Sequence, residues 1–181
     1  ACGAIFYYLS ETQHHQLPHI VNINRIVEDE FLWMDRFTIR NLELLNSNSI
    51  NGISLLNIID QTISAMGGRL LKRWMSFPLK SIEKIKSRQE IVKYLVDDKT
   101  SLQLVSTQIK QISDLERLVS KVATLKISPR EIIYLKNSLD AIIPIKNWAM
   151  DCTNETVQKM GNHLNDCVAI RTKIAQTLTE N

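Results

Sequence analysis

Apolar side chains recur three or four positions apart along most of this chain, which is the spacing of amphipathic helices. Short polar residues precede several of these segments, where a side chain can accept a hydrogen bond from an unpaired backbone N–H group; examples are Asp35, Ser54 and Ser81. We predict helices at about 2–12, 37–44, 55–60, 69–76, 82–96, 101–109, 114–122, 129–142 and 157–178. The pattern therefore predicts a mainly α fold with many helices.

Two of these helices begin with a capping box, in which the first side chain and the side chain three positions on both bond to the backbone. Ser113 with Glu116 forms one such pattern, and Ser128 with Glu131 forms the other. Pro144 lies within the second helical pattern, where proline removes a backbone donor and kinks or ends a helix. We expect an interruption there.

Two stretches depart from the helical spacing. Residues 20–27 and 31–34 are rich in β-branched and aromatic side chains and flank an acidic turn at 28–30, which predicts one small β-hairpin near the N-terminus. The Gly67–Gly68 pair interrupts the apolar pattern, so we expect the helix after it to begin at Arg69.

The composition excludes several classes of protein. The chain of 181 residues has only 5 Gly and 4 Pro, which is few for a many-stranded sandwich or barrel. No apolar run approaches the roughly 18 residues of a membrane span, and we expect no membrane partner. Cys2, Cys152 and Cys167 are too few and too widely spaced for a disulfide framework or a zinc ligand set, which favours a reducing compartment.

Nothing in the sequence indicates catalysis or a cofactor. None of the 5 glycines belongs to a phosphate-binding loop of the G-x-x-x-x-G-K-[S/T] or G-x-G-x-x-G type. His15 and His19 are four positions apart, but Pro18 interrupts the helix that would bring them together on one metal ion. We predict no catalytic, cofactor-binding or metal-binding residue in this chain, which is therefore not itself an enzyme.

Positive charge gathers in the middle of the chain, where residues 61–136 hold 15 basic and 7 acidic side chains. Lys80, Lys84 and Arg88 are four positions apart, a spacing that places them on one face of a helix. Such a row could contact the phosphate backbone of DNA, so we take these three residues as a possible DNA contact. The alternative, that the basic side chains only keep helix faces solvated, stays open.

Several charged residues are embedded among leucines and isoleucines. Arg40, Asp114, Glu116 and Arg117 are the clearest cases, and Arg69 lies in a similar setting. Because a buried charge must be paired, we predict a structural ion-pair network that joins helices, with Arg117 largely buried beside a carboxylate. A binding role for these residues is the alternative.

Four stretches between residues 8 and 131 occur in the order and spacing of a known family. They are Tyr8–Gln13 with Leu17–Ile20; Met34–Leu44; Ser54–Leu56 with Asp60–Thr62, Ala65–Trp74 and Pro78–Leu79; and Asp114–Leu118 with Ser128–Glu131. Together they resemble the core, or lever, domain of the MutS family of DNA mismatch-recognition ATPases. The resemblance implies that 1–181 is one segment of that domain, with a first helix and hairpin at 1–34, a core of short helices at 35–127 and the start of the lever helices at 128–181.

The resemblance also implies a function that the chain serves only as part of a longer protein. MutS-like proteins are homodimers that bind mismatched double-stranded DNA, use ATP and Mg²⁺, and work with a MutL-like partner in the bacterial cytoplasm, on the nucleoid. Within such a protein this segment would transmit conformational change between the DNA-binding and ATPase domains and would contact those other domains. Two further functions stay open, a free-standing helical nucleic-acid-binding module and a protein–protein adaptor.

Overall fold

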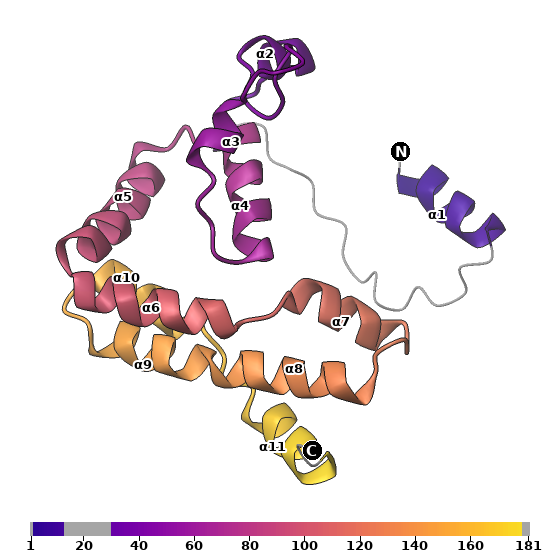
Figure 1. Ribbon diagram of the computed structural model, residues 1–181, viewed down its shortest axis with the longest axis vertical. Helices are drawn as coiled ribbons and strands as arrows, with labels where there is room; N and C mark the ends of the chain where they lie inside the picture. The colour runs from indigo at the N-terminus through magenta and orange to yellow at the C-terminus, as the bar shows by residue number, and fades with distance from the viewer. Residues whose placement is uncertain (1, 13–29, 179–181) are drawn as a thin grey trace.

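The computed structural model of the chain describes residues 2–12 and 30–178, and helices make up most of them (Figure 1). The helices are α1 (Cys2–Glu11), α2 (Arg36–Asn41), α3 (Leu55–Ile59), α4 (Ala65–Ser76), α5 (Ile82–Asp97), α6 (Lys99–Gln111), α7 (Leu115–Ala123), α8 (Pro129–Asp140), α9 (Ile142–Asp151), α10 (Glu155–Asn162) and α11 (Val168–Thr177). Within these described ranges there is no β-strand. The fold is mainly α, as the spacing of the apolar residues predicts.

Four of the helices form a two-row arrangement, which we call the α6–α9 hairpin. α6 and α7 follow one another in one row, and α8 and α9 return beside them, so that α7 packs on α8 and α6 packs on α9 (Figure 1). Three side-chain contacts join the two rows: Lys121 with Glu131, Ser138 with Ser113, and Trp148 with Ser101. The rows are therefore connected near their turn, in the middle and toward their open end.

A buried apolar cluster lies at the open end of this hairpin. It consists of Ala149 on α9, Cys152 in the following turn and Val157 on α10. Ile91, Tyr94 and Trp148 pack against it. α10 covers the cluster by packing on both α9 and α5, so this end of the hairpin is the best-buried apolar region among the described residues.

Residues 31–80 form an arm that contains α2, α3 and α4 and leads into α5 (Figure 1). Its outer part is held together by backbone hydrogen bonds, since the N–H groups of Leu55 and Leu56 donate to the carbonyls of Glu43 and Leu44 at 3.0 and 2.9 Å. Large apolar side chains of the arm nevertheless lie exposed: Phe37, Leu42, Ile50, Ile53, Ile58 and Ile63. These exposed side chains contrast with the buried apolar cluster at the open end of the hairpin.

The predicted helix starts are largely confirmed. The caps are Asp35 for α2, Ser54 for α3 and Ser81 for α5, each accepting a hydrogen bond from the backbone N–H three positions on. The capping box at the start of α8 forms with both of its hydrogen bonds, between Ser128 and Glu131. α8 ends at Asp140, four positions before Pro144, because a proline ring would collide with that carbonyl in a continuous helix.

The glycine pair does not mark a helix start, and that prediction is wrong. α4 begins at Ala65 and contains both Gly67 and Gly68, because the hydroxyl of Ser64 caps it by accepting from the N–H of Gly67. A Cβ at Gly68 would lie 3.2 Å from the hydroxyl oxygen of Thr62. The small residues therefore let the preceding turn lie close against the first turn of the helix.

The prediction that Ser113 caps α7 in a capping box is also wrong, because the cap is the next residue, Asp114. Asp114 caps α7 by accepting from the N–H of Arg117 at 3.2 Å. Ser113 donates its own N–H to the hydroxyl of Ser138 at 2.9 Å, and the carboxylate of Glu116 bonds elsewhere. The two groups that would close the capping box, the Ser113 N–H and the Glu116 carboxylate, thus form hydrogen bonds with distant residues instead.

The long helix predicted at 157–178 is divided into α10 and α11. The interruption covers residues 163–167 and includes Cys167, whose φ of 46° is left-handed. The side chain of Asn165 accepts the N–H of Cys167 at 2.8 Å, a short-range contact that competes with continued helix.

The predicted β-hairpin is not supported. Residues 20–29, its first strand and most of its turn, lie outside the described residues. Within the described part, Phe31 forms an isolated antiparallel bridge with Leu79, and Leu32 donates its N–H to the carbonyl of Pro78 at 2.7 Å. Residues 30–32 therefore direct their backbone groups to the corner before α5.

Candidate functional site: an ion-pair cluster and an arginine-lined hollow

Arg69, near the start of α4, joins the arm to the α6–α9 hairpin. Its Nη1 and Nη2 donate to the two carboxylate oxygens of Asp114 at 2.9 and 2.7 Å, and its Nε and Nη2 donate to one oxygen of Glu116 at 2.8 and 2.5 Å. We call these three residues the Arg69 cluster. A planar guanidinium between two carboxylates is a directional contact, and here it joins residues more than forty positions apart.

The charges of the Arg69 cluster stabilise one another. The hydrogen bonds from Arg69 hold the pKa of Asp114 below its usual value, against the opposing effect of desolvation. The hydrogen bond to Asp114 is in turn the main reason that the pKa of Arg69 is raised. The side chain of Arg69 is 48 % exposed, so solvent and salt reach the contact and it can dissociate without opening an apolar core.

The other end of α4 is fixed to α5. The guanidinium of Arg88 lies 3.7 Å from the centroid of the Trp74 ring, and burial lowers the pKa of this arginine. Lys84, also on α5, pairs with Glu30 at 3.0 Å. Because α5 packs on α6, the helices α4, α5 and the α6–α9 hairpin form the three sides of a triangle (Figure 1).

The network predicted from the sequence therefore has a different membership. The structure brings Asp114 and Glu116 together, but their cation is Arg69 and not Arg117. Arg117 is exposed, and no ion pair reaches its side chain among the described residues, so its predicted burial is wrong. The backbone N–H of Arg117 donates to Asp114 at 3.2 Å, whereas its side chain makes no hydrogen bond among the described residues.

Arg40 lies away from this cluster, on α2. Its Nε donates to the side-chain oxygen of Asn48 at 3.2 Å, and no carboxylate is paired with it in the part of the chain that the structure describes. The sequence pattern marked Arg69 as an embedded charge of the same kind but did not identify Asp114 and Glu116 as its partners. No local signal could have done so, since its two partners lie on another helix.

The predicted basic row on one helix face does not form. Lys80 lies before Ser81, the residue that caps α5, and is therefore outside the helix. Lys84 is paired with Glu30, and Arg88 lies over Trp74. Two of the three predicted DNA contacts thus have partners within the chain.

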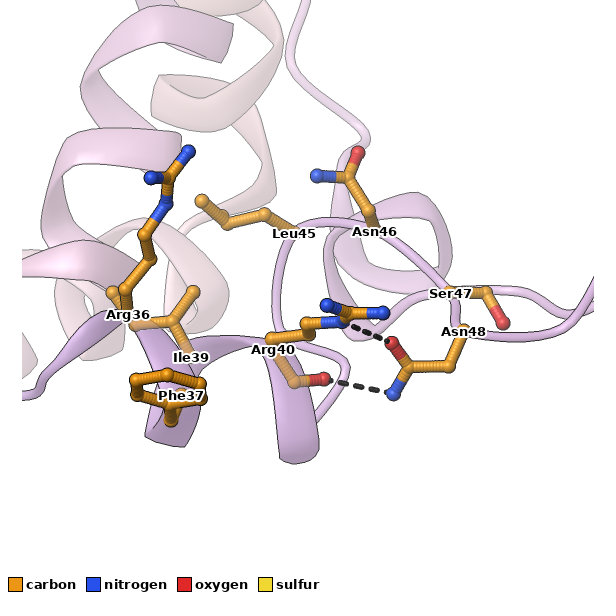
Figure 2. Close-up of a pocket in the computed structure, with 8 residues that line it drawn as sticks. All are labelled: Arg36, Phe37, Ile39, Arg40, Leu45, Asn46, Ser47 and Asn48. Carbon is orange, nitrogen blue, oxygen red and sulfur yellow. Dashed lines mark hydrogen bonds between the residues drawn. The ribbon is translucent and has the colours of Figure 1, made fainter.

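A hollow of about 690 Å³ lies between α2 and the loop that follows it (Figure 2). Its lining residues are Arg36, Phe37, Ile39, Arg40, Leu45, Asn46, Ser47 and Asn48, and we call it the Arg36–Arg40 hollow. Asn48 fixes its shape by accepting from the Arg40 side chain and donating to the Arg40 carbonyl at 3.0 Å. No pattern in the sequence indicates this hollow, because the loop must fold back on α2 to form it.

Other site types are not found in the described ranges. No group of three or more His, Cys, Asp or Glu side chains there could hold a metal ion. None of the helices in those ranges has the length and apolar character needed to cross a membrane.

The family model for MutS domain III matches residues 37–181. The chain belongs to the MutS family. It is 59 % identical over 180 residues to the DNA mismatch repair protein MutS of Flavobacterium psychrophilum, and 56 % and 54 % identical over the same length to those of Flavobacterium johnsoniae and Christiangramia forsetii. Each match covers 99 % of this chain and 21 % of the relative. The chain therefore spans about a fifth of the length of the MutS relatives it matches, within which it corresponds to domain III.

Proposed function

We propose that this chain is the domain III part of a longer MutS protein and that it carries conformational change between the DNA-binding and ATPase parts. The longer protein would be a homodimer that binds mismatched double-stranded DNA, uses ATP with Mg²⁺, and acts with a MutL-like partner in the bacterial cytoplasm. The segment itself would bind neither ATP nor metal. Its division into parts at 1–34, 35–127 and 128–181 belongs to the same proposal.

The Arg69 cluster is the observation that supports this proposal most directly. Coupling between distant sites needs rigid elements that can take discrete arrangements. α4 contacts α5 at its far end through Trp74 and Arg88 and is followed there by the short corner at 77–81, whereas its near end is held on α7 by ionic hydrogen bonds. Breaking those bonds would free α4 to turn about the corner at 77–81 without unfolding either helix.

The experiment tests coupling in the longer MutS protein. Arg69→Ala removes the cluster, and Arg69→Lys keeps the charge but loses the forked geometry. We expect both variants to bind a mismatched duplex without ATP and to hydrolyse ATP without DNA at rates close to the parent protein. The ATP-dependent release of the mismatched duplex should slow by about tenfold in Arg69→Ala, a change within the usual range of coupling energies.

The control is Lys159→Ala. Lys159 pairs with Glu155 along the exposed face of α10 at 3.9 Å, so its loss removes an ion pair that joins no two helices. This variant should release DNA like the parent protein. If Arg69→Ala leaves ATP-dependent release unchanged, or if Lys159→Ala slows it equally, α4 does not carry the coupling.

A further inference from the structure

The Arg36–Arg40 hollow carries positive charge that the described part of the chain leaves unmatched. No hydrogen bond or ion pair reaches the Arg36 side chain there, and Arg40 uses only its Nε, on the neutral oxygen of Asn48. None of the residues that line the hollow is acidic. Arg36 and Arg40, one helical turn apart on α2, therefore line a cavity with no carboxylate in its lining.

The nearest acidic residues in the sequence cannot supply that carboxylate. Glu43 accepts from the backbone N–H of Asn48 at 2.7 Å and from the hydroxyl of Ser47 at 3.3 Å. Asp35 caps α2 by accepting from the N–H of Thr38 at 2.6 Å. Both carboxylates are engaged in holding α2 and the loop that follows it, and neither is among the residues that line the hollow.

The hollow also has apolar side chains in its lining, so we expect its occupant to carry an apolar group as well as an acidic one. Phe37, Ile39 and Leu45 lie in the wall, and Phe37 is 73 % exposed. Leu42, one turn along the chain, is 59 % exposed. A sugar–phosphate backbone presents mainly anionic oxygens with little apolar surface, whereas a peptide can place a large apolar side chain beside an acidic one.

We propose that the Arg36–Arg40 hollow receives the acidic side chain of a peptide segment whose neighbouring apolar residue covers Phe37. This segment belongs to the part of the longer MutS protein outside residues 1–181. The proposal therefore rests on the proposed function, which places this chain within that longer protein. The two guanidiniums bind the carboxylate by forked, charge-assisted hydrogen bonds. The volume, about 690 Å³, is large enough for a few side chains of such a segment.

The test places the photoreactive residue p-benzoylphenylalanine at position 37 of the longer protein. Irradiation without DNA, followed by mass spectrometry, should identify one cross-linked segment outside 1–181 that contains Asp or Glu next to an apolar residue. The same experiment on Arg36→Ala/Arg40→Ala should lower the cross-link yield by about tenfold, as expected when hydrogen bonds to a charged group are lost. The Arg36→Lys/Arg40→Lys variant should retain part of the yield, because it keeps the charge but not the fork.

The matched control is Lys126→Ala/Arg130→Ala. These residues are also a basic pair four positions apart, they are exposed, and their side chains make no hydrogen bond in the described part of the chain. Their loss should leave the cross-link yield unchanged. Melting curves by circular dichroism show whether each variant folds.

Several outcomes would overturn the proposal. They are a cross-link only within 1–181, a cross-link only to a duplex DNA added in a parallel sample, a segment without an acidic residue, a yield that survives both alanine substitutions, and no cross-link at all. The proposed function is tested separately. The cross-link can form even if Arg69→Ala leaves ATP-dependent release unchanged, and Arg69→Ala can slow that release even if no cross-link forms.

Discussion

Gly161 on α10 packs directly against Ala149 on α9. A Cβ built on Gly161 would come within 2.8 Å of the Cβ of Ala149 and 3.4 Å of its backbone carbon. Both residues are buried, and they belong to the region where α10 covers the apolar cluster. The absence of a side chain at 161 therefore sets how closely the two helices approach.

Gly161→Ala should destabilise the chain although alanine is the better helix former. Overpacking costs about 1–3 kcal/mol, and the gain in helix propensity offsets up to about 1 kcal/mol of it. We expect a net loss of about 1 kcal/mol for Gly161→Ala and more for Gly161→Val, measured by urea unfolding. Gly3→Ala is the control, because nothing lies within 4 Å of a Cβ at Gly3. Equal stability of the Gly161 variants and the parent chain would contradict the packing argument.

Ser138→Ala should weaken the middle of the α6–α9 hairpin. The Ser138 hydroxyl is fully buried, accepts the N–H of Ser113 at 2.9 Å and donates to the carbonyl of Tyr134 at 2.7 Å. Removing it leaves a backbone donor unpaired, at a cost of about 1–3 kcal/mol in the free energy of unfolding. Ser120→Ala, on the exposed side of α7, should change that free energy by less than about 0.5 kcal/mol. Calorimetry that ranks the two variants equally would refute the role of Ser138.

Glu131 should make the stability of the chain depend on pH in the acid range. The hydrogen bond from Lys121 is the main cause that lowers the pKa of Glu131 from 4.5 to about 2. A depressed carboxyl pKa stabilises the folded state above the unfolded pKa, and that contribution is lost as pH falls from about 4.5 toward 2. The stability difference between the parent chain and Glu131→Gln should thus shrink across this window. Glu83→Gln changes an exposed carboxylate with no ion pair in the described ranges and serves as the control. A difference independent of pH would count against the Lys121 contact.

Arg88→Gln should loosen the joint between α4 and α5. The guanidinium of Arg88 lies over the Trp74 ring at 3.7 Å, and such contacts contribute about 0.5–1 kcal/mol near a surface. We expect a loss of that size in urea unfolding, whereas Lys93→Gln, an exposed change on the same helix, should have little effect. The contact is unimportant if the two variants unfold at the same urea concentration.

Helix starts could be predicted because a cap is a contact between residues three positions apart. Ser128 with Glu131 succeeds for that reason, and so does Asp35. The prediction fails at Ser113, whose N–H goes to Ser138 on another helix. Local chemistry fixed the elements wherever no distant residue competed for the same groups.

The candidate sites depend on distant contacts, and the sequence predicted them only in part. Charge among apolar residues identified Asp114 and Glu116 but could not choose between Arg69 and Arg117 as their cation. The choice depends on where α4 meets α7, which no helical periodicity encodes. The Arg36–Arg40 hollow is hidden for a similar reason, since its wall forms only when residues 45–48 return to α2.

The two rows of the α6–α9 hairpin are interrupted at nearly the same level. α6 gives way to α7 at residues 112–114, α8 gives way to α9 at Ala141, and the hydrogen bond between Ser113 and Ser138 crosses between the rows beside both interruptions. A continuous helix resists bending through its unbroken series of backbone hydrogen bonds. Here the helix is interrupted in both rows at nearly the same level. We therefore expect the hairpin to resist stretching along its long axis, and to bend at the level of these two interruptions when a force acts across that axis. A force applied at the turn would change the angle between its two halves and leave its length unaltered.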